Sequence, residues 1–161
     1  MTMKALTITI RKAEILFDVD AATHSFARAT EGASLRRADA LQSDSGDQMN
    51  REMVVRFADR RAAELEERLG RFLASTTAAA YDVQISGDEA YTFALYVEDA
   101  FEDTQLRPLA QDMESYIADG ATADWYAANG DGQGAVYAQR LPLVLNRIIG
   151  HIVERKFPTR V

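Results

Sequence analysis

Hydrophobic and polar positions alternate near the amino terminus, and this alternation predicts β-strands. Leu6, Ile8 and Ile10 are separated by threonines, a period-two pattern rich in β-branched residues. After a basic pair the alternation resumes one step out of phase, at Ala13, Ile15, Phe17 and Val19. We expect a tight turn between two strands, although a bulge in one long strand would give the same phase slip.

The two segments that follow carry weaker signals. The stretch "DAATHSFARAT" predicts either a third short strand or one helical turn capped by Asp20. Residues 30–47 show little periodicity and end in a cluster of serine, aspartate and glycine. We therefore expect a mobile loop over residues 30–47.

A β-hairpin is predicted in the middle of the chain. The segments "YDVQIS" (81–86) and "YTFALYVE" (91–98) both alternate, and the short segment "GDEA" between them is typical of a turn. The apolar positions of the two strands are Tyr81, Val83, Ile85, Tyr91, Phe93, Leu95 and Val97.

Apolar residues at three- and four-residue spacing predict three helices. The first begins after Asp47, which is a good N-cap, and runs to about Leu73. The remaining positions of this helix are dense in arginine and glutamate, so we expect one buried and one solvated face. Its apolar positions are Met53, Val54, Phe57, Ala58, Ala62, Leu65, Leu69 and Phe72.

The other two helices follow the predicted hairpin. Asp103 or Thr104 caps the second helix, where Pro108 is tolerated because it falls in the first turn. The apolar stripe of this helix is Leu106, Leu109, Met113, Ile117, Ala121 and Trp125. Pro142 either starts the third helix or kinks it, and the helix stops before Pro158. Its apolar positions are Leu141, Val144, Leu145, Ile148, Ile149 and Ile152.

The order of these elements predicts the fold class. Strands, a helix, strands and two helices indicate an α+β fold, in which a small antiparallel sheet packs against about three main helices. The last two helices would form an αα-hairpin. With 161 residues, the chain is most simply a single domain over 1–161.

Composition removes several classes of function. The chain has no cysteine, which excludes disulfide scaffolds, thiolate zinc sites and cysteine nucleophiles. Its net charge of −7 argues against direct binding to nucleic acid, which normally requires a basic patch. No run approaches about 18 consecutive apolar residues, and the first residues lack the pattern of a signal peptide, so we expect no membrane span.

The glycine-rich segment "NGDGQG" (129–134) raises the question of a ligand loop. Asn129, Asp131 and Gln133 would match the first ligands of a calcium loop, but its last ligand position falls on Arg140 instead of glutamate. A phosphate cradle needs a preceding strand, whereas these glycines follow a predicted helix. We therefore interpret the segment as the joint between two helices, with Gly130 in a C-terminal cap.

Acidic residues are concentrated in "VEDAFED" (97–103). A site for paired carboxylates or a divalent metal needs such side chains to converge in a cleft. Neighbouring side chains of a strand point to opposite faces, so Glu98 and Asp99 should diverge. A solvated strand end followed by a helix N-terminus is the favoured interpretation.

No catalytic constellation is apparent in the sequence. His24 and His151 are the only histidines, and neither has a second histidine three or four residues away. No serine lies in a nucleophile elbow. Trp125 follows the spacing of core positions. We therefore predict no catalytic residues, no metal ligands and no cofactor.

Charge is divided unevenly along the chain. Residues 82–124 contain eleven acids and one base, a net charge of −10, whereas residues 135–161 contain five bases and one acid, a net charge of +4. The bases include a short basic tail over 154–161. Within one chain the two regions would neutralise each other, and between copies they would suit a head-to-tail contact of the kind that closes rings.

The run "YTFALYVEDAFEDTQLRPLAQDMESYIADGATADWYAANG", followed by a helix that ends in "RKFPTR", resembles uncharacterised small proteins from the structural-gene modules of tailed bacteriophages and prophages of gut bacteria. The likeness covers most of the chain, including the "KALTITIRKAEILFDV" segment, and it lies in pattern and composition. It implies a virion or assembly protein, such as a neck, head–tail connector or tail-completion component. Pro142 and the loop at 30–47 depart from the pattern of that group.

We therefore expect a non-enzymatic protein, present in the virion or in the host cytoplasm during assembly, that self-associates and docks to other phage structural proteins. The alternative is a small-molecule or divalent-metal-binding module or enzyme that uses the acidic region 98–103. The predicted protein-interaction residues are Arg155, Lys156, Arg160, Glu98, Asp99, Glu102 and Asp103.

Overall fold

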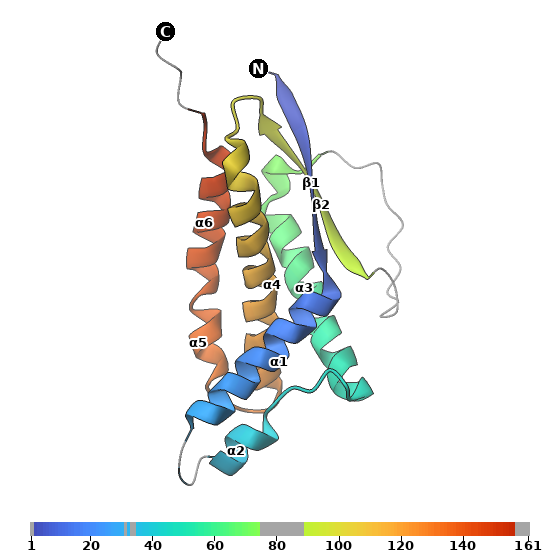
Figure 1. Cartoon of the computed structure of the whole chain (residues 1–161), viewed down its shortest axis with the longest axis vertical. Helices are drawn as coiled ribbons and strands as arrows, with labels where there is room; N and C mark the ends of the chain where they lie inside the picture. The colour runs from blue at the N-terminus through green and yellow to red at the C-terminus, as the bar shows by residue number, and fades with distance from the viewer. Residues whose placement is uncertain (1, 31, 33–34, 75–88, 157–161) are drawn as a thin grey trace.

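The structure is a computed structural model that describes residues 2–30, 32, 35–74 and 89–156. A two-stranded antiparallel sheet and several helices form an elongated α+β molecule, as predicted (Figure 1). The main elements are β1 (Met3–Arg11), α1 (Lys12–Ala29), α2 (Leu35–Ala40), α3 (Gln48–Arg68), β2 (Ala90–Glu98), α4 (Leu106–Ala128), α5 (Gly134–Ala138) and α6 (Leu141–Val153). The two 3₁₀ turns are η2 (Gly70–Phe72) and η3 (Asp103–Gln105).

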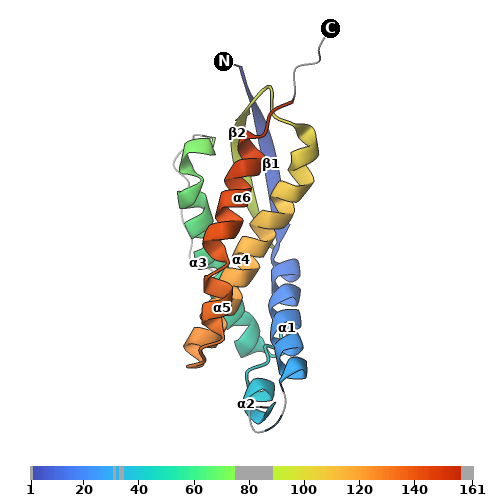
Figure 2. The same cartoon turned by 90° about the vertical axis from the view of Figure 1, so that its left-hand side faces the viewer.

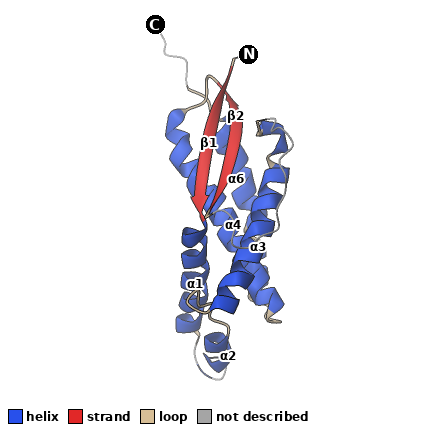
Figure 3. Cartoon of the chain, turned by 90° about the vertical axis from the view of Figure 1, so that its right-hand side faces the viewer, coloured by secondary structure: helices blue, strands red, loops and turns tan. Residues whose placement is uncertain are grey.

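The sheet pairs the first strand of the chain with a strand more than eighty residues away. β1 and β2 run antiparallel in an unbroken register from Met3 opposite Glu98 to Arg11 opposite Ala90. Ile8 and Ile10 are buried, as the alternation predicts, whereas the threonines between them are exposed. Figure 3 shows both strands in front of the helices, so one face of the sheet packs on the helices and the other faces outward.

The second predicted strand, at 13–19, is wrong because these residues form the first half of α1 (Lys12–Ala29). The same correction applies to "DAATHSFARAT", which is neither a third strand nor a single turn but the second half of α1. Phe17, one of the alternating apolar residues, is 67% exposed. The buried positions follow helical spacing instead: Ile15, Leu16, Val19, Thr23 and Ala27. Both periods fit the short apolar run 13–19, and packing against other helices selects the helical one.

The prediction of a loop over residues 30–47 is wrong for residues 35–40, which are helical. This stretch contains α2, and the residues that follow are held against the helices by specific hydrogen bonds. Trp125 donates its indole N–H to the carbonyl oxygen of Leu41 (2.7 Å), and the hydroxyl of Thr23 accepts from the backbone N–H of Ser43 (2.9 Å). Asp20 accepts from the backbone N–H of Ser45 (3.0 Å). Buried side chains therefore anchor a segment that shows no periodicity of its own.

The first predicted helix is confirmed as α3, including its cap. The Asp47 side chain accepts from the backbone N–H of Asn50 (2.9 Å), as expected of an N-cap. The α-helix ends at Arg68, earlier than the predicted Leu73, and the turn η2 follows it. Its exposed positions are largely charged, so the predicted solvated face is confirmed.

The second strand of the predicted hairpin is confirmed as β2 (Ala90–Glu98), with Phe93, Leu95 and Val97 buried. The first strand of that hairpin, at 81–86, lies outside the described residues. The described partners of β2 are β1 along its full length and, at its other edge, Leu73, which forms a single bridge to Leu95.

The start of α4 differs from the sequence prediction. The turn η3 precedes the helix, and the N-cap side chain of this turn is Glu102, which accepts from the backbone N–H of Thr104 (3.3 Å). Neither Asp103 nor Thr104 caps α4 as predicted. Pro108 lies in the first turn of the helix, as expected.

The helix α4 is the centre of the fold. It contacts α1, α3, α5 and α6, and Figures 1 and 2 show these helices arranged around it. The last two long helices, α4 and α6, form the predicted hairpin-like pair, with the short α5 between them. Pro142 occupies the first turn of α6 and starts that helix, which resolves the alternative of a kink.

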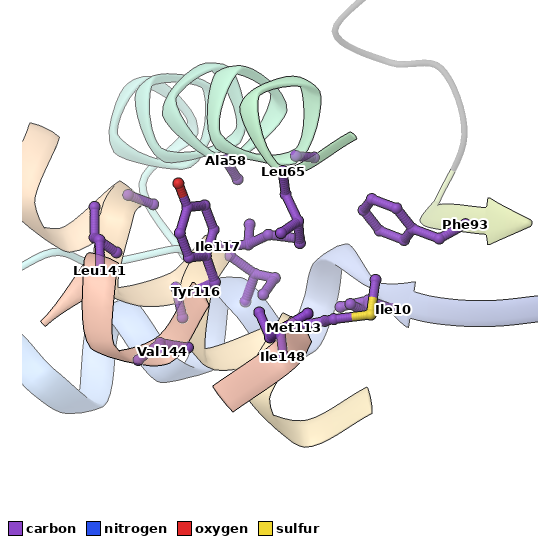
Figure 4. Close-up of a cluster of buried hydrophobic side chains, with 14 of the residues drawn as sticks. Ile10, Ala58, Leu65, Phe93, Met113, Tyr116, Ile117, Leu141, Val144 and Ile148 are labelled. Atoms are coloured by element: carbon purple, nitrogen blue, oxygen red, sulfur yellow. The ribbon is translucent and has the colours of Figure 1, made fainter. Parts of the chain in front are cut away.

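One hydrophobic core joins the helices to the inner face of the sheet. In Figure 4, Ile10 and Phe93 of the sheet point toward Met113 and Ile117 of α4, and side chains of α3 and α6 pack around these residues. Leu65 of α3 is completely buried among them. Truncation of such a residue to alanine typically costs about 2–5 kcal/mol, so this cluster accounts for much of the stability of the fold.

Candidate interaction surfaces

The glycine-rich segment 129–134 joins α4 to α5, and its polar groups make hydrogen bonds within the chain. Gly130 has a φ of +69°. Its backbone N–H donates to Ala127 (3.1 Å), and that of Asp131 donates to Tyr126 (2.9 Å). These two bonds, with a left-handed glycine between helix and loop, form a Schellman motif that ends α4. The predicted interpretation as a joint is therefore confirmed.

The only carboxylate of this segment, that of Asp131, is engaged by protein groups. One carboxylate oxygen of Asp131 accepts from the backbone N–H of Gln133 (2.8 Å), and the other accepts from Arg37 of α2 (2.9 Å). These two donors lower the pKa of Asp131 below its ordinary value, the backbone bond being the larger cause. A β-carbon on Gly134 would lie 2.7 Å from the carbonyl oxygen of Ala123. This glycine is therefore required for the close approach of α5 to α4.

The acidic segment at 98–103 and the start of the basic tail meet within one chain. Arg155 donates to Glu98 (2.9 Å), and Lys156 donates to Asp103 (3.1 Å). Lys4 also contacts Asp103, at 2.5 Å. Lys4 and, to a smaller extent, Lys156 lower the pKa of the Asp103 carboxyl below its ordinary value. This arrangement corresponds to the first alternative drawn from the sequence, neutralisation within the chain.

Backbone hydrogen bonds fix the tail against the same segment. The N–H of Glu102 donates to Glu154 (3.1 Å), and the N–H of Lys156 donates to Ala100 (2.8 Å). A bridge between Phe101 and Arg155 completes the contact.

The remaining predicted interaction residues do not converge on a common site. Asp99 is exposed, and the carboxylate of Glu102 is engaged by Thr104. Arg160 lies outside the described residues. Among the residues that the structure describes, no three histidine, aspartate or glutamate side chains cluster in a way that could hold a metal ion.

The two histidines have different surroundings. His24 is exposed on α1, where it lines a shallow, open depression together with Phe17 and Arg28. His151 lies between α6 and α4, and its two ring nitrogens contact Gln105 (2.6 Å) and Asp112 (2.9 Å). It therefore links the two long helices near the carboxyl end of α6.

A polar network between α3 and α4 was not identified from the sequence. Arg61 makes two hydrogen bonds to Asp124 (2.7 and 3.0 Å) and one to Glu64 (2.8 Å). Glu64 also accepts from the hydroxyl of Tyr116 (2.9 Å). Burial and this bond raise the pKa of Tyr116 to about 12. The residues are 63 and 52 positions apart in these pairs, so no local spacing could have indicated them.

Carboxyl groups meet at the contact between α1 and α4. Burial, followed by the neighbouring carboxyls of Asp18 and Glu14 on α1, raises the pKa of Glu114 to about 7. Burial also raises the pKa of Asp119, which lies farther along α4 and is likewise affected by Asp18. The interface therefore favours a protonated carboxyl at Glu114.

The exposed residues of α6 are uncharged except for Arg147, which is paired with Asp112 of α4. We define the α6 outer face as the exposed residues Pro142, Leu143, Asn146, Gly150 and Val153. Leu143 is 65% exposed and Val153 is 52% exposed. The one arginine of α6, Arg147, points toward Asp112 of α4 (3.0 Å). By contrast, α3 exposes mainly arginine and glutamate.

Gly150 is the unusual member of this face. It lies in the middle of a helix, where glycine is less favourable than alanine by about 0.5–1 kcal/mol. A β-carbon added at this position would meet no atom within 4 Å. Nothing in the described part of the chain therefore requires a glycine at this position.

Comparisons with known proteins give no further information, because no family model, curated protein or solved structure matches the chain. Within the described residues, no helix is both long and apolar enough to cross a membrane.

Proposed function

We propose that this protein is a non-enzymatic virion or assembly protein of a tailed bacteriophage or prophage. It acts by self-association and by docking to other structural proteins, as a head–tail connector, neck or tail-completion component does. The proposal places it in the virion and, during assembly, in the host cytoplasm. The sequence resemblance described above supports the setting, and the α6 outer face supports the mode of action.

The α6 outer face is the observation that carries the proposal. In a chain with 27% charged residues and a net charge of −7, two copies repel each other wherever their acidic surfaces approach. The α6 outer face brings no like charges together, and contact between two copies would remove Leu143 and Val153 from water. Gly150 leaves room for another backbone to approach closely.

The size of this face determines how strong the contact would be. A helix of 13 residues is about 20 Å long. One face of such a helix provides less than the roughly 800 Å² per partner that is usual for a stable pair. We therefore expect weak pairwise association that becomes effective only when several contacts act together, as in a ring.

The basic tail has a different part in this proposal. Arg155 and Lys156 hold the end of α6 against the strand end near Glu98 and Asp103. The tail thereby fixes the orientation of the helix that carries the α6 outer face. A direct role of these residues and of Asp99, Glu102 and Arg160 in docking remains part of the proposal.

Sedimentation velocity over a wide concentration range tests this proposal. The test variant combines Asn146→Glu with Gly150→Glu, which places two carboxylates on the α6 outer face at exposed positions. We expect the wild-type mass to rise with concentration and the variant to associate at least about tenfold more weakly, because the contact would then oppose like charges. Glutamate favours helix more than glycine does, so the variant should keep its fold.

The matched control combines Ser25→Glu with Ala29→Glu on α1. Both positions are exposed and four residues apart on a helix, like the test pair, so the control adds the same charge elsewhere. It should associate like the wild type. A wild type that stays monomeric at every concentration, or a test variant that associates as well as the control, would contradict the proposal.

A further inference from the structure

Within the described residues, one edge of β1 has no partner strand, and we call it the open edge. Its backbone groups can be identified individually. The N–H of Lys12 donates to Glu89 (2.9 Å), and the N–H of Asp99 donates to Thr2 (3.2 Å). In an antiparallel pair, residues alternate between those that bond to the partner strand and those whose N–H and C=O point away from it. The even-numbered residues of β1 therefore bond to β2. The odd-numbered residues that point to the open edge are Met3, Ala5, Thr7 and Thr9.

The two edges of the sheet differ. At the far edge of β2, the N–H of Ala74 donates to Ala94 (3.0 Å), and Leu73 bridges to Leu95. Among residues 2–30, 32, 35–74 and 89–156, no segment pairs with the corresponding edge of β1. The chain therefore already adds backbone pairing at the edge of β2. The edge of β1 presents the same N–H and C=O groups.

The open edge lacks the features that normally block strand addition. Such edges usually carry charges, proline, a bulge or only a very short strand. β1 has nine residues in continuous register, and the six from Ala5 to Ile10 are uncharged and include neither proline nor glycine. Lys4 faces inward and pairs with Asp103. Such a charge discourages strand addition, but it lies only at the beginning of β1.

The charge of Arg11, at the carboxyl end of β1, indicates which residue an added strand would carry there. Lys4 and Lys12 are paired with Asp103 and Asp59. Arg11 is exposed, and within the described part of the chain no carboxylate lies within ion-pair distance of it. An acidic side chain on an added strand would therefore find an available guanidinium at this end.

A second copy of β1 fits this edge poorly. An antiparallel pair of β1 strands places the helices of both copies on the same face of the joined sheet. α4 contacts β1, so such a pair would bring the two acidic α4 helices toward each other, and their like charges would repel. A single extended segment brings no second copy of α4.

We propose that the open edge of β1 binds an extended segment of another protein, which adds an antiparallel strand. The segment is uncharged over the length of Ala5–Ile10 and carries an acidic residue at its amino-terminal end, opposite Arg11. Backbone hydrogen bonds supply affinity in this mode of recognition, and the end charge supplies direction. This inference rests on the proposed function, because it specifies the kind of partner to which the protein docks.

Amide hydrogen exchange measured by NMR on the full chain tests the proposal. The probe is a synthetic capped peptide of about nine residues in which threonine and valine alternate after two amino-terminal aspartates. At saturation, exchange at Ala5, Thr7 and Thr9 should slow by at least about tenfold, because these amides gain hydrogen bonds. The amides of Ile8 and Ile10 already bond to β2 and should change little.

Charge reversal tests the direction of binding. A second probe carries two lysines in place of the aspartates, and it should bind the wild type more weakly at low salt. Arg11→Glu should reverse the preference between the two probes. The matched control, Arg28→Glu, makes the same change at an exposed position on α1 and should leave the preference unchanged.

Backbone blocking provides the final control. Thr7→Pro removes an N–H that points away from β2, so the β1–β2 hydrogen bonds remain and probe binding should be lost. The proposal would be overturned if millimolar probe did not slow exchange at Ala5, Thr7 and Thr9. It would also be overturned if Arg11→Glu still preferred the aspartate probe. Concentration-dependent protection of these amides without probe would assign the edge to a second copy instead. Each outcome is independent of the sedimentation test of the α6 outer face.

Discussion

At the scale of single residues, two glycines in helices have opposite surroundings. A β-carbon on Gly120 of α4 would lie 2.6 Å from the Cγ and Cδ atoms of Arg61, whose side chain crosses α4 at this point to reach Asp124. A β-carbon on Gly150 of α6 would contact nothing. The contact between α3 and α4 explains the glycine at position 120. Within the described residues, no contact explains the glycine at position 150.

We predict opposite effects of alanine at these two positions. Gly150→Ala should raise the free energy of unfolding by about 0.5–1 kcal/mol, because alanine favours helix. Gly120→Ala should lower it by about 1 kcal/mol or more, because displacement of Arg61 outweighs the same gain. Urea denaturation of both variants checks this, and equal changes in the two would contradict the account of Gly120.

Residue chemistry explains which local predictions were confirmed. Asp47 and Gly130 act through their own backbone neighbours, and both caps follow from residue type and position. Arg61 and Trp125 act through groups brought close by the tertiary fold. Sequence spacing contains no information about such partners.

At the scale of elements, α1 is the clearest case in which tertiary packing overrides a local pattern. Its first residues fit both a strand and a helix, and the burial of Ile15, Val19 and Thr23 against other helices favours the helix. β1 ends where α1 begins, so one continuous stretch supplies the sheet and then the helix layer. The phase slip after Arg11 marked this change of element, although a turn was expected there.

The contact between α1 and α4 should make stability depend on pH. The pKa of Glu114 is about 7 in the folded chain, above its ordinary value. The folded state therefore binds this proton more tightly, and its contribution to stability is lost as pH rises from about 4.5 to about 7. Glu114→Gln should reduce this decline and be more stable than the wild type at pH 8.

Thermal unfolding between pH 4 and pH 8 measures this effect. Asp18, Glu14 and Asp119 belong to the same contact, so part of the pH dependence should remain in Glu114→Gln. Glu66→Gln removes a charge from an exposed position on α3 and serves as the control. A Glu114→Gln variant with the pH profile of this control would refute the assignment.

At the scale of the whole molecule, the sequence predicted the α+β class and the pairing of the last two long helices but not the strand pairing. Local periodicity identified β2, whereas its partnership with β1 depends on contacts across most of the chain. The candidate surfaces divide in the same way. Charge counts indicated that the acidic segment and the basic tail would attract each other, but only the structure shows that Arg155 pairs with Glu98 of the same chain.

The α6 outer face could have been suspected from the sequence. The helical stripe of α6 was correctly predicted to be apolar, but its exposed side is also uncharged except for Arg147, which is unusual in a chain with this composition. That signal becomes interpretable once the exposed fractions of Leu143 and Val153 are known.

The salt dependence of self-association tests the central claim most directly, namely that copies meet through the uncharged α6 outer face. Sedimentation of the wild type at about 50 mM and about 500 mM NaCl compares weak and strong screening of charge. Screening reduces the repulsion between chains of net charge −7, so we predict that association stays equal or strengthens at high salt. Association that disappears at high salt, or a monomer under both conditions, would contradict the account.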